Sequence, residues 1–264
     1  MEEKIARTNL WLAVLLLLGI SCSVLAQSHK PAETDPKANE VFTLTDQADT
    51  FNNLEQHEKA IELLKRAVRL APESAPTLRN LGVVYLNANQ PQLAVEAFEQ
   101  SLLLKANEAE TYFDLGLANL GCERYAAAVE ALKRANQLTP DSSATYNALG
   151  SAYAHLGRTE DAFDAFRQAI KLNPGFAAAH ANLGMLQMST GQRREASNSL
   201  EKSARLAPNP AEQYFALGVL SLIRQDRKGA LTQYSLLKNL SPELADLLYH
   251  TIYDGAHVVQ FRKK

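Results

Sequence analysis

One small residue recurs at every thirty-fourth position of this chain from residue 48 onward, and no insertion breaks the register through six copies. A fixed period of this length is typical of repeat architectures, in which each unit is one supersecondary element that packs on its neighbours. The repetition therefore predicts a stack of similar units. The recurring small residues are Ala48, Gly82, Gly116, Gly150, Gly184 and Gly218.

Apolar residues follow helical spacing in two halves of each copy, and a turn near the fifteenth residue separates the halves, at Gly157 and Gly191 in two copies. Each copy is therefore predicted to be a pair of helices. We expect Gly150 on the first helix to face Ala162 on the second, so that the two helices approach closely. Pro174 ends the second helix, because proline cannot continue the hydrogen-bond ladder.

Further columns of the repeat support this division into helix pairs. Alanine lies twelve residues after each small residue, at Ala60, Ala94, Ala128, Ala162, Ala196 and Ala230. Leucine recurs at Leu70, Leu104, Leu138, Leu172, Leu206 and Leu240. Two residues later come Pro72, Ala106, Pro140, Pro174, Pro208 and Pro242.

The six copies resemble tetratricopeptide repeats. The fourth copy meets the family pattern at Tyr146, Leu149, Gly150, Tyr153, Ala162, Phe166, Ala169 and Pro174. The resemblance implies an all-α protein, a right-handed α-solenoid of six stacked helix-turn-helix repeats, with the first helix of each repeat on a concave face. The first copy departs from the pattern at Gln47 and Ala48, which indicates either a polar N-terminal capping unit or a degenerate first helix.

The resulting division of the chain has an N-terminal segment, a linker, six repeats and a C-terminal end. The linker contains two prolines and shows no apolar period, which is typical of flexible segments. We expect a signal peptide or signal anchor over 1–26, a polar linker over 27–40, repeats over 41–74, 75–108, 109–142, 143–176, 177–210 and 211–244, a capping helix over 243–254 and a tail over 255–264.

The N-terminal segment contains an uninterrupted apolar run from Leu10 to Ile20 and then small residues up to Ala26. This order is typical of a signal peptide, so we expect cleavage after Ala26 and a periplasmic or secreted protein. Two alternatives stay open. The segment could be retained as a membrane anchor, although it is short for a bilayer span, or Cys22 could carry a lipid.

Composition and motif spacing argue against catalysis and against nucleic acid as a partner. The formal net charge of the 264-residue chain is −2, which gives no basic footprint for a phosphate backbone. His57, His155, His180 and His250 lie in different copies without metal-ligand spacing, and His180 stands at a packing position. Once residues 1–26 are removed, Cys122 has no second cysteine with which to form an intramolecular disulfide. We therefore expect no enzyme activity, no cofactor and no metal.

The resemblance implies a protein or peptide partner in the concave groove. One apolar stripe, formed by Phe113, Leu117 and Leu120, is a candidate anchor surface, although Leu117 and Leu120 could pack against the adjacent repeat instead. A second hypothesis is a membrane-anchored subunit of a cell-envelope assembly. The groove positions of the family correspond here to Arg79, Asn80, Val83, Leu86, Phe113, Asp114, Leu117, Leu120, Asn182, Met185, Met188, Phe215, Val219 and Leu222.

Overall fold

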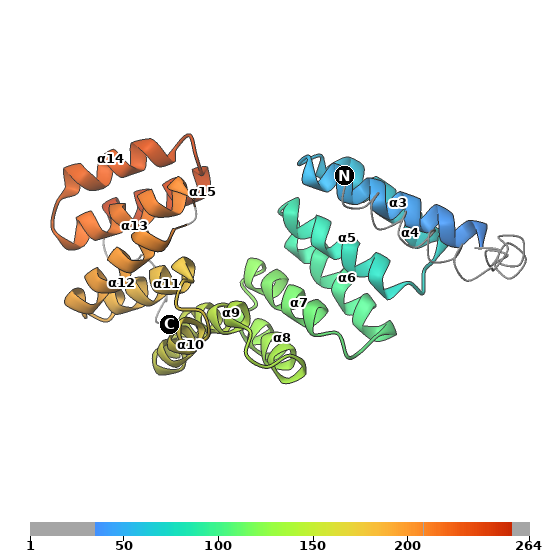
Figure 1. The fold of residues 1–264 in the computed structure, drawn as a ribbon, viewed down its shortest axis with the longest axis horizontal. Coiled ribbons are helices and arrows are strands. Elements are labelled where there is room, and N and C mark those ends of the chain that lie inside the picture. The colour runs from blue at the N-terminus through green and yellow to red at the C-terminus, as the bar shows by residue number, and fades with distance from the viewer. Residues whose placement is uncertain (1–34, 208, 255–264) are drawn as a thin grey trace, which may run out of the picture.

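The computed structural model of the protein describes residues 35–207 and 209–254, which form thirteen helices and no strand (Figure 1). The expected signal peptide, residues 27–34 of the expected linker, and the tail over 255–264 lie outside the described residues. Within the described ranges, no helix combines the length and the apolar character that crossing a bilayer would need.

Twelve of the helices form six antiparallel pairs, and the last helix follows the sixth pair. This arrangement confirms the predicted all-α solenoid of stacked helix pairs. The pairs are α3 (Pro36–Asn53) with α4 (His57–Leu70), α5 (Ala75–Asn87) with α6 (Pro91–Leu104), α7 (Ala109–Gly121) with α8 (Tyr125–Leu138), α9 (Ser143–His155) with α10 (Thr159–Leu172), α11 (Ala177–Ser189) with α12 (Arg193–Leu206), and α13 (Pro210–Ile223) with α14 (Arg227–Leu237); α15 spans Pro242–Asp254.

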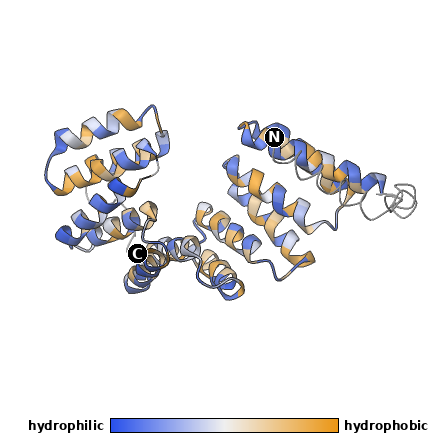
Figure 2. Ribbon diagram, in the orientation of Figure 1, coloured by the Kyte–Doolittle hydropathy of each residue, from blue (hydrophilic) through white to orange (hydrophobic). Residues whose placement is uncertain are grey.

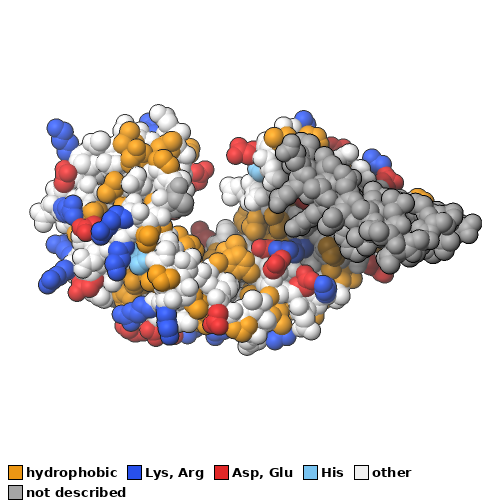
Figure 3. Space-filling view, in the orientation of Figure 1, with side chains coloured by type: hydrophobic (Ala, Val, Ile, Leu, Met, Phe, Trp, Pro, Cys, Tyr) orange, Lys and Arg blue, Asp and Glu red, His pale blue; other side chains and the backbone are white. Residues whose placement is uncertain are grey.

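The stack curves because the first helices of neighbouring repeats lie closer together than the second helices. Each first helix contacts the first helix of the next repeat, from α3 with α5 to α11 with α13. In the described chain, no two second helices come within 8 Å of each other, measured between Cα atoms. The first helices therefore form the inner layer of an open arc (Figure 1), and Figure 3 shows the hollow between its two arms.

The recurring glycines make room for a large side chain on the partner helix. A Cβ atom at Gly150 would lie 2.5 Å from a ring carbon of Phe166, and one at Gly116 would lie 2.5 Å from Leu132. Ala162 was expected to face Gly150, and in the next repeat the carbonyl oxygen of the corresponding Ala196 does lie 3.3 Å from a Cβ placed at Gly184, but the nearest atoms at Gly150 belong to Phe166. The side chain that fills the space lies sixteen residues after the glycine, one helical turn beyond the alanine, which is itself fully buried.

The last repeat uses α15 for this contact. A Cβ atom at Gly218 would lie 2.5 Å from Leu248 of α15, whereas Tyr234, sixteen residues after Gly218, is only partly buried. Ala245, Leu248 and Ile252 of α15 join the buried cluster of the last repeats. The C-terminal helix therefore completes the core of the sixth repeat.

The first helix begins earlier than expected. Residues 36–40, assigned to the linker from the sequence, are helical, because the Asp35 carboxylate accepts a hydrogen bond from the Lys37 amide (3.0 Å) and Pro36 stands in the first turn. Of the 18 residues of α3, only Leu44 and Ala48 are buried. The outer face of this terminal repeat is exposed, and hydrophobic and hydrophilic residues alternate along this and the other helices in Figure 2.

The turn inside every repeat contains one residue with positive φ, and these residues also recur every thirty-four positions. Gly157 and Gly191 have φ values of 72° and 80°, as the sequence suggested for a glycine turn. The corresponding residues in the other repeats are not glycine, yet their φ values lie between 55° and 62°. They are Glu55, Asn89, Glu123 and Gln225.

We predict that Gly150→Leu lowers the free energy of unfolding by about 2 kcal/mol or more, because overpacking a close helix crossing costs about 1–3 kcal/mol and the Phe166 ring has little room to move. The matched control is Ala144→Leu, which adds the same side chain at an exposed position of the same helix. Urea denaturation of both variants checks the difference. Equal midpoints would contradict the assigned packing face.

Candidate protein-interaction groove

The candidate site is the inner face, which we define as the surface of the first helices α3, α5, α7, α9, α11 and α13 toward the hollow of the arc. Residues thirty-four positions apart share a register position, so they lie on the same face of successive first helices. Two pockets and a set of polar contacts between repeats lie along this surface.

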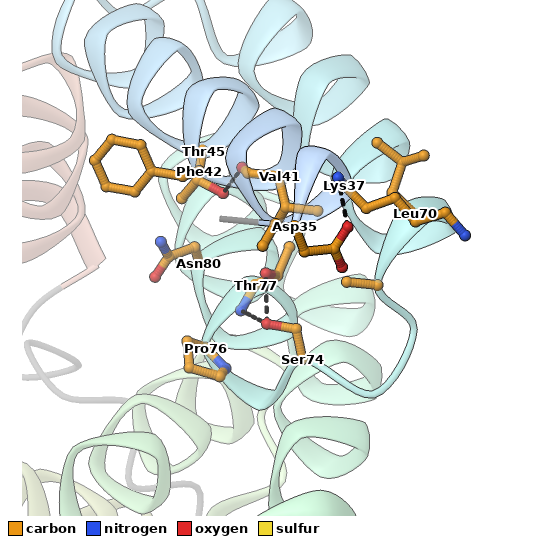
Figure 4. A pocket seen from close by; sticks show the side chains of 12 residues that line it. Asp35, Lys37, Val41, Phe42, Thr45, Leu70, Ser74, Pro76, Thr77 and Asn80 are labelled. Atoms are coloured by element: carbon orange, nitrogen blue, oxygen red, sulfur yellow. Dashed lines mark hydrogen bonds between the residues drawn. The ribbon is translucent and has the colours of Figure 1, made fainter. Parts of the chain in front are cut away.

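The N-terminal pocket lies between α3, the turn after α4 and the start of α5 (Figure 4). Its volume is about 450 Å³. Phe42, which is 73% exposed, and Thr45 come from α3, while Pro76 and Asn80 come from α5. Asn80 is one of the predicted groove residues, and here it lines a pocket that is open to solvent and mostly apolar.

The C-terminal pocket lies between α11, α13 and α15, with one residue from α12. Its volume is about 170 Å³, and Glu212 is the one charged residue among those that line it. Met185 and Phe215, both predicted from the sequence, belong to its wall, although they are only 7% and 5% exposed. The lining residues are Ala178, Ala181, Asn182, Met185, Ser203, Glu212, Phe215, Leu244 and Leu247.

Polar side chains of the first helices bind one another across the repeat boundaries. The Asn182 amide donates to Asn147 Oδ1 (3.0 Å), and the Arg79 guanidinium donates to Asp114 Oδ2 (2.9 Å). In each pair the two residues are thirty-five positions apart. These contacts tie neighbouring first helices together and fix the spacing of the inner face.

The pair of Arg79 and Asp114 is partly shielded from water. The side chains are 27% and 15% exposed, and Arg79 also contacts Glu110 at 2.7 Å. Burial raises the pKa of Asp114 above its ordinary value, while the charge and hydrogen bonds of Arg79 act in the opposite direction. Arg79 therefore offsets part of the effect of burial on this carboxylate.

Acidic residues outnumber basic residues on the first helices. Lys37 and Arg79 are the basic residues of these six helices, and the second helices carry more Lys and Arg than Asp and Glu. The inner layer of the described arc is therefore negatively charged relative to the outer layer. The acidic residues of the first helices are Glu40, Asp46, Asp49, Glu110, Asp114 and Glu212.

The apolar stripe of α7 has a packing role. Phe113, Leu117 and Leu120 are partly buried and pack against the hydrophobic cluster that contains Ala148 and Leu149 of the next repeat. Packing was predicted as the alternative role of Leu117 and Leu120, and all three residues take part in it. Each keeps some exposed surface.

The remaining predicted groove residues are divided between surface and core. Val219 is fully buried, so it offers no surface to a partner and its assignment to the groove was wrong; its position in the repeat is covered by the cluster that includes Leu248. The others are partly buried against the core. They are Val83, Leu86, Met188 and Leu222.

Six residues of the C-terminal pocket were not among the predicted groove residues, namely Ala178, Ala181, Ser203, Glu212, Leu244 and Leu247. The register could have identified Ala181, because it lies thirty-four positions before Phe215. Leu244 and Leu247 belong to α15, which follows the last repeat, so the period gives no position for them.

His180 and His155 take structural positions. His180 is buried and its Nε2 atom lies 3.1 Å from the Pro174 carbonyl oxygen, which confirms its packing role. His155 stacks on Tyr125 with ring centroids 4.4 Å apart, and burial lowers its pKa. Over the described ranges, no group of three or more His, Cys, Asp or Glu side chains could hold a metal ion.

We predict that Arg79→Gln lowers the free energy of unfolding at pH 7 by about 1–2 kcal/mol, because it leaves the shielded Asp114 carboxylate without its cation. Because burial raises the pKa of Asp114, the loss should shrink as the pH falls through the acidic range, where the carboxylate takes up a proton and no longer needs the charge of Arg79. Urea denaturation at pH 7 and across the acidic range measures this. Arg66→Gln, which removes an exposed ion pair with Glu40, is the control and should change stability by less than about 1 kcal/mol. A pH-independent loss would contradict this role of Arg79.

Models of known protein families match most of the described chain. Three models, each described as a tetratricopeptide repeat, match residues 40–105, 79–143 together with 113–177, and 155–218. No curated protein sequence matches the chain.

Many solved structures are similar to this fold. MamA is 29% identical, with a TM-score of 0.55 over 60% of this chain and 93% of MamA. The pilF protein of Pseudomonas aeruginosa is 21% identical, with a TM-score of 0.62 over 79% of this chain and 95% of its own. PilW, described as a type IV pilus biogenesis factor, is 18% identical, with a TM-score of 0.65 over 79% and 98% of the two chains.

Proposed function

The chain belongs to the tetratricopeptide repeat family of non-catalytic protein-interaction scaffolds, and we propose on this premise that its inner face binds an extended segment of a partner protein. The observation that carries the proposal is the C-terminal pocket, which lies on the inner face between two first helices and α15. A pocket with apolar walls and a few polar groups is the common form of an anchor site for one side chain of a partner.

The charge of the inner face supports a particular kind of partner. Carboxylates of α3, α7 and α13 outnumber the cations of the same layer, and Arg79 is already engaged by two of them. A segment with Lys or Arg residues beside an apolar anchor complements this surface. The N-terminal pocket with the exposed Phe42 gives such a segment a second apolar contact at the other arm.

We expect Ala178→Arg to abolish partner binding, because the long cationic side chain enters the C-terminal pocket and repels a basic segment. The matched control is Ala144→Arg, which places the same charge at the same register position one repeat earlier, outside the pocket. Affinity capture from the native compartment, quantified by mass spectrometry, compares the two variants with the wild type. The same captured proteins at the same levels with Ala178→Arg would exclude this pocket as the binding site.

We further propose that the scaffold acts after export, in the periplasm or outside the cell. The support is the apolar run and the small residues that follow it in the first 26 residues. The alternative is a membrane-anchored subunit of a cell-envelope assembly, which the same apolar run supports if it is retained. The two proposals share the groove and differ only in the state of the N-terminus.

The mature protein should begin at Gln27, because Val24 and Ala26 form the small pair that follows the apolar run. Mass spectrometry of the N-terminus of the protein from its native source measures this. An intact chain with Met1 in the membrane fraction would favour the anchored subunit, and a lipid on Cys22 would also contradict cleavage after Ala26.

A further inference from the structure

The residues that follow α15 have the chemistry that the inner face complements. Residues 255–264 read GAHVVQFRKK, in which an apolar stretch ending at Phe261 precedes the three cations Arg262, Lys263 and Lys264. We propose that Phe261 of this segment occupies the C-terminal pocket of the same chain, with the three cations beside the carboxylates of the inner face. The segment would then be a built-in competitor of the partner, and this last step rests on the proposed function.

The distance along the chain permits this contact. The last described helix ends at Asp254, and Leu247, which lines the pocket, lies seven residues earlier on that helix. Seven residues of helix are about 10 Å long. Seven extended residues, from Asp254 to Phe261, span up to about 23 Å. The segment is therefore long enough to turn back along α15 and reach the pocket.

The lining of the pocket matches an aromatic residue followed by cations. Leu244 and Leu247 of α15 and Phe215 of α13 supply apolar walls. Glu212 stands at the same pocket, and its Oε1 atom accepts one hydrogen bond, from the Asn209 amide. A carboxylate has room for further donors, so a guanidinium or ammonium group next to Phe261 can pair with Glu212.

A weak contact is sufficient when both groups belong to one chain. A short flexible connection gives an effective concentration of about 1 mM. With an intrinsic dissociation constant of about 0.1 mM, the tethered segment would occupy the pocket about nine-tenths of the time and weaken a competing ligand about tenfold. A partner that binds more tightly would still displace the segment.

The test uses a fluorescent peptide with the sequence of residues 255–264 and measures its binding by fluorescence polarisation. We expect it to bind a chain that ends at Asp254, and to bind the full chain about tenfold more weakly. Binding should weaken in high salt, because ion pairs contribute. In the full chain, Phe261→Ser should restore binding of the peptide to the level of the shortened chain.

Matched variants separate the pocket from general charge effects. Ala178→Arg in the shortened chain should abolish binding of the peptide, whereas Ala144→Arg should retain it. Circular dichroism and thermal unfolding check that both variants keep the fold. Equal loss with both variants would overturn the assignment to the pocket.

Three further outcomes would overturn the proposal. The first is no binding of the peptide to the shortened chain, and the second is equal affinity for the shortened and the full chain. The third is a full chain that is dimeric by light scattering and becomes monomeric on removal of residues 255–264, which would place the segment on a second copy. Each outcome is independent of partner capture, so it leaves the proposed function to its own test.

Discussion

The close contact between a glycine and a large side chain sixteen residues later determines the geometry of the second to fifth repeats. Because Gly82, Gly116, Gly150 and Gly184 have no Cβ atom, Phe98, Leu132, Phe166 and Leu200 reach the first helix and the two helices of a pair lie close together. Such an interior is densely packed, so each pair behaves as a rigid unit. The curvature then follows from how these units stack, with first helices in contact and second helices apart.

The groove is a product of this stacking and needs no additional element over most of its length. Side chains at one register position form a row across the first helices. Hydrogen bonds such as the one from Asn182 to Asn147 hold neighbouring first helices together. At the C-terminal end, α15 replaces the missing next repeat. Its Leu248 fills the core beside Gly218, while Leu244 and Leu247 close a pocket on the inner face. One helix therefore both caps the core and shapes the site.

The period of the sequence was sufficient to predict the helices and their pairing, because these features depend on contacts that recur in each copy, whereas the groove positions came from the family resemblance. The period was insufficient wherever a contact is not repeated. Val219 looked like a groove residue by its register, yet it is buried because the last repeat packs on α15. The atoms nearest to Gly150 belong to Phe166, one helical turn beyond Ala162, and the spacing of small residues gives no size for the side chain that fills this gap. The early start of α3 depends on a local cap at Asp35, outside the repeat.

The positive φ value in each intra-repeat turn distributes backbone strain unevenly along the solenoid. A residue with a side chain pays about 1–2 kcal/mol for the left-handed conformation, and glycine does not. Glycine occupies this place only in the fourth and fifth repeats, at Gly157 and Gly191, whereas a residue with a side chain carries the strain in the first three repeats and in the sixth. In a linear array whose stability is summed from neighbouring units, the fourth and fifth repeats are consequently the ones without this strain in their turns. Opening of the intra-repeat turn is thus favoured in the first three repeats and in the sixth, and the fourth and fifth repeats resist it best.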